Sequence, residues 1–97
     1  KLNKVKIQEG MILSNEPGYY KKGSYGIRIE NLVFVKKIKN KICFENLTLA
    51  PIEKDLINFN LLTKLEKNYL FKYHLDVYSK ISKYLSLKEK KWLASYI

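Results

Sequence analysis

The chain has 97 residues, of which 46% are hydrophobic and 29% charged, and its formal net charge is +10. This length allows one small domain at most, and the hydrophobic content is enough for a modest core, which argues against a disordered chain. The longest apolar runs are far too short to span a bilayer, and no apolar segment typical of a secretory signal follows the basic start. We therefore predict a cytoplasmic protein without a membrane partner. The single cysteine, Cys43, excludes an internal disulfide, suits a reducing compartment and is expected to pack as a small hydrophobic residue.

The positive charge raises the hypothesis of a nucleic-acid-binding domain, but the kind of basic residue argues against it. Lysine supplies 18 of the 19 basic residues, and Arg28 is the only arginine. Arginine is favoured for base readout and for two-pronged phosphate contacts, and the lysines are spread along the whole chain. We interpret the charge as a solvated lysine surface and predict no nucleic-acid partner.

Residues 11–14 are predicted to form a short buried strand that ends just before Glu16. Pro17 lacks the N–H that a sheet hydrogen bond needs, so strand pairing is expected to stop or bulge there. Gly18 allows backbone conformations that other residues avoid. The strand is thus expected to be interrupted directly after Glu16, at a kind of place where functional sites are common.

A hairpin is predicted around the polar loop at 21–24, because apolar runs flank this loop on both sides. If the chain folds back at Gly23, Glu16 and Glu30 lie opposite each other and project to the same face. Two carboxylates so placed repel each other unless a positive charge lies between them. The pair alone leaves two interpretations open: the side chains splay into water, or a metal cation holds them together.

Residues 27–38 form the strongest predicted strand, and both of its faces are largely apolar, which is typical of a central strand covered on both sides. A carboxylate at Glu30 would be costly there without a partner, and Arg28 lies two residues away on the same face. Arg28 either forms an ion pair with Glu30 or supports it by hydrogen bonds while Glu30 binds a metal, and the two roles are compatible. A polar turn follows at 36–41, and residues 42–49 are predicted to form a further strand.

After Pro51 the hydrophobic period changes from that of strands to that of helices. Capping-box sequences at 63–66 and 86–89 predict helices over 64–85 and 87–96. An apolar stripe on the first helix is interpreted as core or interface, and its members are Leu70, Tyr73, Val77, Ile81 and Tyr84. His74, beside this stripe, is expected to pack or cap rather than to bind a metal. Trp92 and Leu93 are expected to anchor the last helix.

Two motifs resemble the end of the catalytic domain of the Xaa-Pro aminopeptidases (aminopeptidase P), which are dinuclear metallopeptidases with the pita-bread fold. The motifs are Glu-Pro-Gly-Tyr-Tyr at 16–20 and Gly-Ile-Arg-Ile-Glu-Asn at 26–31, in the family's order and with similar spacing. The block at 44–52 and the segment at 62–74 resemble the C-terminal extension of the longer members. The likeness covers nearly the whole chain, and Tyr69-Leu70, where the family usually has Trp-Leu, is a departure that affects packing only.

This resemblance implies an α+β fold that is the C-terminal portion of a pita-bread fold, with antiparallel hairpin and sheet strands followed by two C-terminal helices. Residues 1–52 would be the β-rich end of the catalytic domain, and residues 53–97 the helical extension. The resemblance also implies that Glu16 and Glu30 are metal ligands, the second bridging both ions, with Arg28 as a hydrogen-bond donor beside them. The implied cofactor is a pair of divalent ions, usually Mn²⁺, and the implied reaction is hydrolysis of the bond between an N-terminal residue and a proline.

The family's two aspartate ligands and its histidines lie upstream of the Glu-Pro-Gly-Tyr-Tyr motif, and none of the thirteen residues before Ser14 is Asp or His. The chain therefore resembles the last part of an enzyme, without a complete catalytic set of its own. We expect it to be inactive alone, to bind metal weakly or not at all, and to act on proline-containing peptides only with the upstream half of the catalytic domain, in the same or a separate chain. A homodimer through the C-terminal part is a further expectation. The alternative is a non-catalytic interaction module that keeps the fold.

Overall fold

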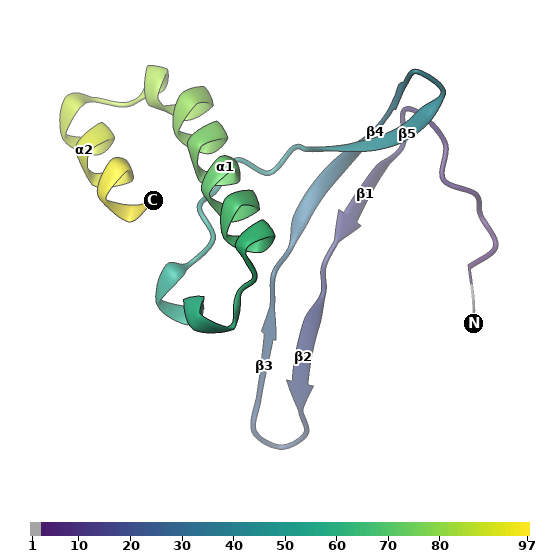
Figure 1. Ribbon diagram of the computed structural model, residues 1–97, viewed down its shortest axis with the longest axis horizontal. Helices are drawn as coiled ribbons and strands as arrows, with labels where there is room; N and C mark the ends of the chain where they lie inside the picture. Colours follow the sequence, from purple (N-terminus) through teal and green to yellow (C-terminus); the bar gives the residue numbers. More distant parts are fainter. Residues whose placement is uncertain (1–2) are drawn as a thin grey trace. The chain divides into compact units, whose positions relative to one another are not determined.

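The computed structural model describes residues 3–97. The chain forms two compact units, Lys1–Thr48 with the strands and Leu49–Ile97 with the helices, so the predicted α+β class is confirmed (Figure 1). The predicted division after residue 52, between catalytic domain and helical extension, stays a prediction. None of the helices among residues 3–97 combines the length and apolar content that a membrane span requires.

The first unit is built on one long hairpin made of two short antiparallel ladders. Strand β1 (Ile12–Asn15) pairs with β4 (Asn31–Ile38), and β2 (Gly18–Lys21) pairs with β3 (Tyr25–Arg28). Both ladders have the same register, centred on Gly23 in the hairpin loop. The φ of this residue is +72°, in a region of backbone conformation that favours glycine. Figure 1 shows β2 and β3 continuing β1 and β4 as one two-stranded ribbon. The predicted hairpin is therefore confirmed, and its first strand begins one residue later than predicted.

The predicted continuous strand over 27–38 is wrong, because Ile29 and Glu30 separate β3 from β4. The cause lies on the opposite side of the hairpin, where Pro17 has no N–H to continue the ladder. A single backbone hydrogen bond crosses the gap, from the Ile29 N–H to the Pro17 carbonyl at 3.1 Å. Glu16 and Glu30 consequently lie at the interruption and not inside a strand.

Strand β4 is the central strand of a three-stranded sheet with the order β1-β4-β5, where β5 comprises Lys41–Asn46. Val33 and Val35 form its buried face, with Val35 at 0% exposure, whereas Leu32 on the other face is 46% exposed. The expectation that both faces are covered is therefore wrong for this chain, because three strands provide no second layer over Leu32.

A two-residue turn joins β4 to β5, and both of its residues, Lys39 and Asn40, have positive φ values of 48° and 63°. Such turns match the natural twist of a hairpin, although asparagine and glycine are better suited to these angles than lysine. Strand β5 ends at Asn46, earlier than the predicted residue 49. Beyond it, the Leu47 N–H still donates to the Leu32 carbonyl at 2.8 Å, and the Thr48 hydroxyl accepts the Leu32 N–H at 2.9 Å.

The second unit contains helices α1 (Lys64–Ile81) and α2 (Leu87–Tyr96), and both start at the predicted capping boxes. Three short 3₁₀ helices accompany them: η1 (Lys54–Leu56), η2 (Phe59–Leu61) and η3 (Ser82–Tyr84). The first helix ends four residues before the predicted Leu85, because Ser86 needs an extended backbone to cap α2 and Leu85 is already extended.

The apolar stripe of α1 is confirmed at its centre and wrong at its end. Tyr73 and Val77 are buried, whereas Tyr84 falls in the 3₁₀ turn and is 76% exposed. On α2, Leu93 is buried as predicted, but Trp92 is 60% exposed and stacks on Tyr96 instead of anchoring the helix in the core.

Adjacent side chains of α1 hold the segment that leads into the helical unit. The Tyr73 hydroxyl donates to the Ala50 carbonyl at 2.7 Å, and His74 Nε2 accepts the Ile52 N–H at 3.0 Å. His74 is 5% exposed. The expectation that this histidine packs or caps is therefore confirmed.

Candidate metal centre

The two glutamates that the sequence singles out lie opposite each other in the gap between the two ladders. Glu16 directly follows β1 and Glu30 directly precedes β4. The register that pairs Asn15 with Asn31 and Gly18 with Arg28 places these glutamates across from one another, on the face shared by the even-numbered residues. The predicted opposition of the two carboxylates is thus confirmed.

Arg28, the last residue of β3, supplies the positive charge that such a pair needs. Its Nη2 lies 2.8 Å from Glu30 Oε2, and its Nε donates to the same oxygen at 3.0 Å. The same Nε is 3.6 Å from Glu16 Oε2. The arginine therefore holds Glu30 with two donors and bridges to Glu16, which offsets the repulsion of the two carboxylates.

The remaining contacts keep part of each carboxylate available. Ser14 on β1 donates its hydroxyl to Glu16 Oε1 at 2.7 Å. Both arginine contacts to Glu30 use Oε2. Among the described residues, no hydrogen bond to Glu30 Oε1 is found. Both glutamate side chains are close to half exposed, so their oxygens can be reached from outside.

Tyr20 completes the cluster and is not among the residues predicted from the sequence. Its ring lies on two glycines of the hairpin: a Cβ at Gly26 would come within 2.6 Å of Tyr20 Cδ1, and one at Gly18 within 2.7 Å of the hydroxyl oxygen. A hydrogen bond with this hydroxyl is the first cause of a raised pKa at Arg28, and the Glu30 carboxylate adds to it. A signal was present in the sequence, since an aromatic residue and two glycines share one face of the predicted hairpin.

The arrangement offers a cation only oxygen ligands from two carboxylates, a set that suits hard divalent ions such as Mn²⁺ better than metals that prefer thiolates. Nowhere in residues 3–97 do three or more acidic, cysteine or histidine side chains gather into a set that could hold a metal. The residues present thus fit part of a divalent-metal site.

Comparisons with known proteins agree with these features. Residues 40–97 match the model of the C-terminal region of the M24 peptidases, and residues 1–37 match the model of metallopeptidase family M24. A probable Xaa-Pro aminopeptidase P of Botryotinia fuckeliana is 45% identical over 80% of this chain, and Xaa-Pro aminopeptidase 1 of Dictyostelium discoideum is 40% identical over 98%. The aligned part amounts to 13% and 17% of these relatives, so the chain spans a small share of their length.

A solved structure shows the same fold. The X-prolyl aminopeptidase of Caenorhabditis elegans, described as a cytosolic enzyme with a di-nuclear active site, superposes with a TM-score of 0.81 at 34% sequence identity. The match covers 93% of this chain and 16% of the nematode protein. The antiparallel strands followed by two helices are therefore the C-terminal portion of a pita-bread fold, as the sequence resemblance implied.

Proposed function

The chain belongs to the M24 metallopeptidases as their C-terminal region, and we propose on this basis that it is the C-terminal part of an aminopeptidase with two metal ions that removes the N-terminal residue from Xaa-Pro peptides. One observation carries the proposal: Glu16 and Glu30 face each other at the break in the hairpin, with Arg28 between them. The likeness to Xaa-Pro aminopeptidases over most of the chain supports the choice of substrate.

In this proposal Glu16 and Glu30 are ligands of a divalent-metal pair, with Mn²⁺ as the proposed ion, since carboxylate oxygens suit hard divalent ions of this kind. When bound, such ions lower the pKa of a water molecule so that it can attack a peptide carbonyl at neutral pH. The protein's own contribution is orientation: Arg28 fixes the plane of the Glu30 carboxylate through Oε2 and leaves Oε1 for a ligand. The Tyr20 hydroxyl adds to the raised pKa of Arg28.

Two carboxylates on one hairpin leave most of a metal's coordination shell to water, so the chain on its own should be inactive and bind metal weakly. The missing ligands would come from the upstream half of the catalytic domain, in the same or a separate chain. The small share of its relatives that the chain spans supports this partnership. A cytoplasmic location and a homodimer through the C-terminal part belong to the same proposal, the location being supported by the cytosolic nematode relative.

The proposal is tested by co-expressing the 97-residue chain with the upstream region of the Dictyostelium relative and assaying a peptide with proline in second position, with Mn²⁺ added. We expect turnover for the pair and none for the chain alone. In the pair, Glu30→Gln should lower turnover at least ~100-fold, because a ligand carboxylate is lost. The matched control is Glu9→Gln, which removes an exposed carboxylate outside the site and should change nothing.

Two outcomes would contradict the proposal. Metal-dependent turnover by the chain alone that survives Glu30→Gln would remove this residue from the site. A chain that folds and melts identically with and without the upstream region, and never gains activity or tighter Mn²⁺ binding, would favour the alternative of a non-catalytic interaction module. The absence of a third clustered ligand among residues 3–97 is the observation that keeps this alternative in view.

A further inference from the structure

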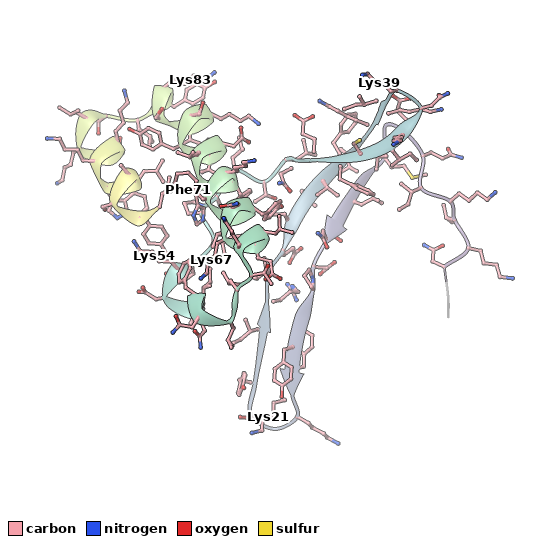
Figure 2. All side chains as sticks on the ribbon, viewed as in Figure 1. Lys21, Lys39, Lys54, Lys67, Phe71 and Lys83 are labelled. Atoms are coloured by element: carbon pink, nitrogen blue, oxygen red, sulfur yellow. The ribbon has the colours of Figure 1, made fainter. Side chains whose placement is uncertain are left out.

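The hairpin formed by β4 and β5 ends in a basic tip that plays no part in the proposed metal chemistry. Lysine occupies four of the six positions in 36–41, and Glu45 is the only acidic residue in the two strands. This glutamate forms an ion pair with Lys36. Among the described residues, the other three lysines have no ion pair, and they are Lys37, Lys39 and Lys41. Figure 2 shows Lys39 at the tip, which thus carries an excess of positive charge.

Strand β5 is an edge strand, because the sheet has the order β1-β4-β5. In an antiparallel ladder, the N–H and C=O groups of alternate residues face the neighbouring strand, and those of the residues between them face away. The Leu47 N–H donates to the Leu32 carbonyl, so the backbone groups of Ile42 and Phe44 face outward. Among the described residues, no backbone hydrogen bond joins Ile42 or Phe44 to a further element. The edge therefore offers main-chain donors and acceptors that another strand can use.

The side chains along this edge differ between the two faces of the sheet. Ile42 and Phe44 share one face and are 45% and 55% exposed. Lys41 and Cys43 lie on the other face, where Lys36 is the direct cross-strand partner of Cys43. A strand added at this edge would thus meet two apolar side chains on one face and a positive charge near the tip on the other.

Charge decides which strand fits this edge. Two copies of a chain with a net charge of +10 repel each other, whereas an acidic segment is attracted to the tip. A nucleic acid would also be attracted, but it has no peptide groups with which to extend a sheet. We propose that the edge of β5 binds an extended acidic segment of a partner protein as an added antiparallel strand. Apolar residues of the segment lie opposite Ile42 and Phe44, and its acidic residues lie opposite Lys41 and the turn.

The probe is the capped peptide Thr-Val-Thr-Val-Glu-Asp, titrated into the 97-residue chain at pH 7.5 and low salt. In the antiparallel direction its valines lie opposite Phe44 and Ile42, and its two acidic residues reach the tip. We expect saturable binding with a Kd on the order of 1 mM. Amide hydrogen exchange followed by NMR should slow at Ile42 and Phe44 but not at Cys43, whose N–H already faces β4.

Matched peptides and variants separate strand pairing from general attraction to a basic protein. Methylation of the two valine nitrogens removes the donors that face β5 and should weaken binding at least ~10-fold. Replacement of Glu-Asp by Lys-Lys should weaken binding by a similar factor of ~10. In the chain, Lys41→Met should weaken binding ~3-fold. Lys22→Met, which removes a charge from the loop between β2 and β3, should leave binding unchanged.

Several results would overturn the proposal. They are equal binding of the methylated or the lysine peptide, equal effects of Lys41→Met and Lys22→Met, and the absence of slowed exchange at Ile42 and Phe44. Slow exchange at these two amides without peptide, lost on dilution, would assign the edge to a second copy of the chain. Peptide binding that disappears when the chain is co-expressed with the upstream region would assign the edge to that region.

Discussion

The hydrogen bond from the Ile52 N–H to His74 Nε2 allows the contribution of this buried histidine to the stability of the helical unit to be predicted. His74→Leu removes the acceptor of the Ile52 N–H while keeping an apolar side chain. The lost hydrogen bond contributes ~1 kcal/mol, and a backbone N–H left without a partner adds a desolvation cost of similar size. We therefore expect the free energy of unfolding to fall by ~2 kcal/mol.

His74→Gln is the matched variant, because a glutamine carbonyl can accept from Ile52 at the position of the lost ring nitrogen. It should recover roughly half of the loss. The measurement is urea unfolding followed by circular dichroism at a helical wavelength, at pH 7.5. Equal destabilisation by Leu and Gln would show that ring packing, and not the hydrogen bond, accounts for the effect.

The pH dependence gives a second test of the same contact. Burial lowers the pKa of His74, and the positive charge of Lys54 acts in the same direction. With the folded-state pKa below the unfolded value of about 6.5, the unfolded state binds the proton more readily. The contribution of His74 is then complete above pH ~6.5 and is lost as the pH falls through the folded-state pKa. His74 is the only histidine, so both variants should lack this loss, and a variant that keeps it would refute the reasoning.

Three further changes test other parts of the fold. Gly26→Ala should push the Tyr20 ring off the hairpin and lower the free energy of unfolding by less than ~1 kcal/mol, because the ring is exposed and can move away. The displacement of the ring is measured by the loss of ring-current shifts at Gly18 in the NMR spectrum, with Ser24→Ala as the control. Lys39→Gly should raise the melting temperature of the chain, since glycine adopts a φ of 48° without strain, whereas Lys39→Ala should not. Ser86→Ala should destabilise α2 by ~1 kcal/mol. The Ser86 side chain is the main cause of the lowered pKa of Glu89, so the same variant should return this pKa towards its ordinary value. An NMR titration measures the pKa, and an unchanged value would count against the capping box.

Local chemistry explains which parts of the fold could be predicted from the sequence. The capping boxes and the turn at Gly23 depend on residues three or four positions apart, and the structure has them as predicted. The break between β3 and β4 could not be read from residues 27–38 alone, because its cause, Pro17, lies across the hairpin. The end of α1 was missed for a related reason, since Ser86 determines it from the following helix.

The candidate site divides in the same way. The opposition of Glu16 and Glu30 follows from the period of two along each strand once the turn is known, so it was predictable. The part played by Tyr20 was not, because it depends on a ring reaching diagonally over Gly18 and Gly26 towards Arg28. Solvent exposure was equally hidden: Tyr84 and Trp92 have residue types typical of a core, but the turn and the short α2 leave them outside.

Charge balance explains why the glutamate pair can be ordered without a metal. Two carboxylates and one guanidinium leave a net charge of −1 at the break in the hairpin, so the pair is stable against its own repulsion and still attracts a cation. The arginine holds Glu30 through one oxygen, which fixes the side chain while the other oxygen stays available. Without Arg28 the two side chains would splay into water, and a metal would have to order them at its own cost in binding free energy. If the proposed metal role is correct, the hairpin supplies two carboxylates whose positions are already set by the fold.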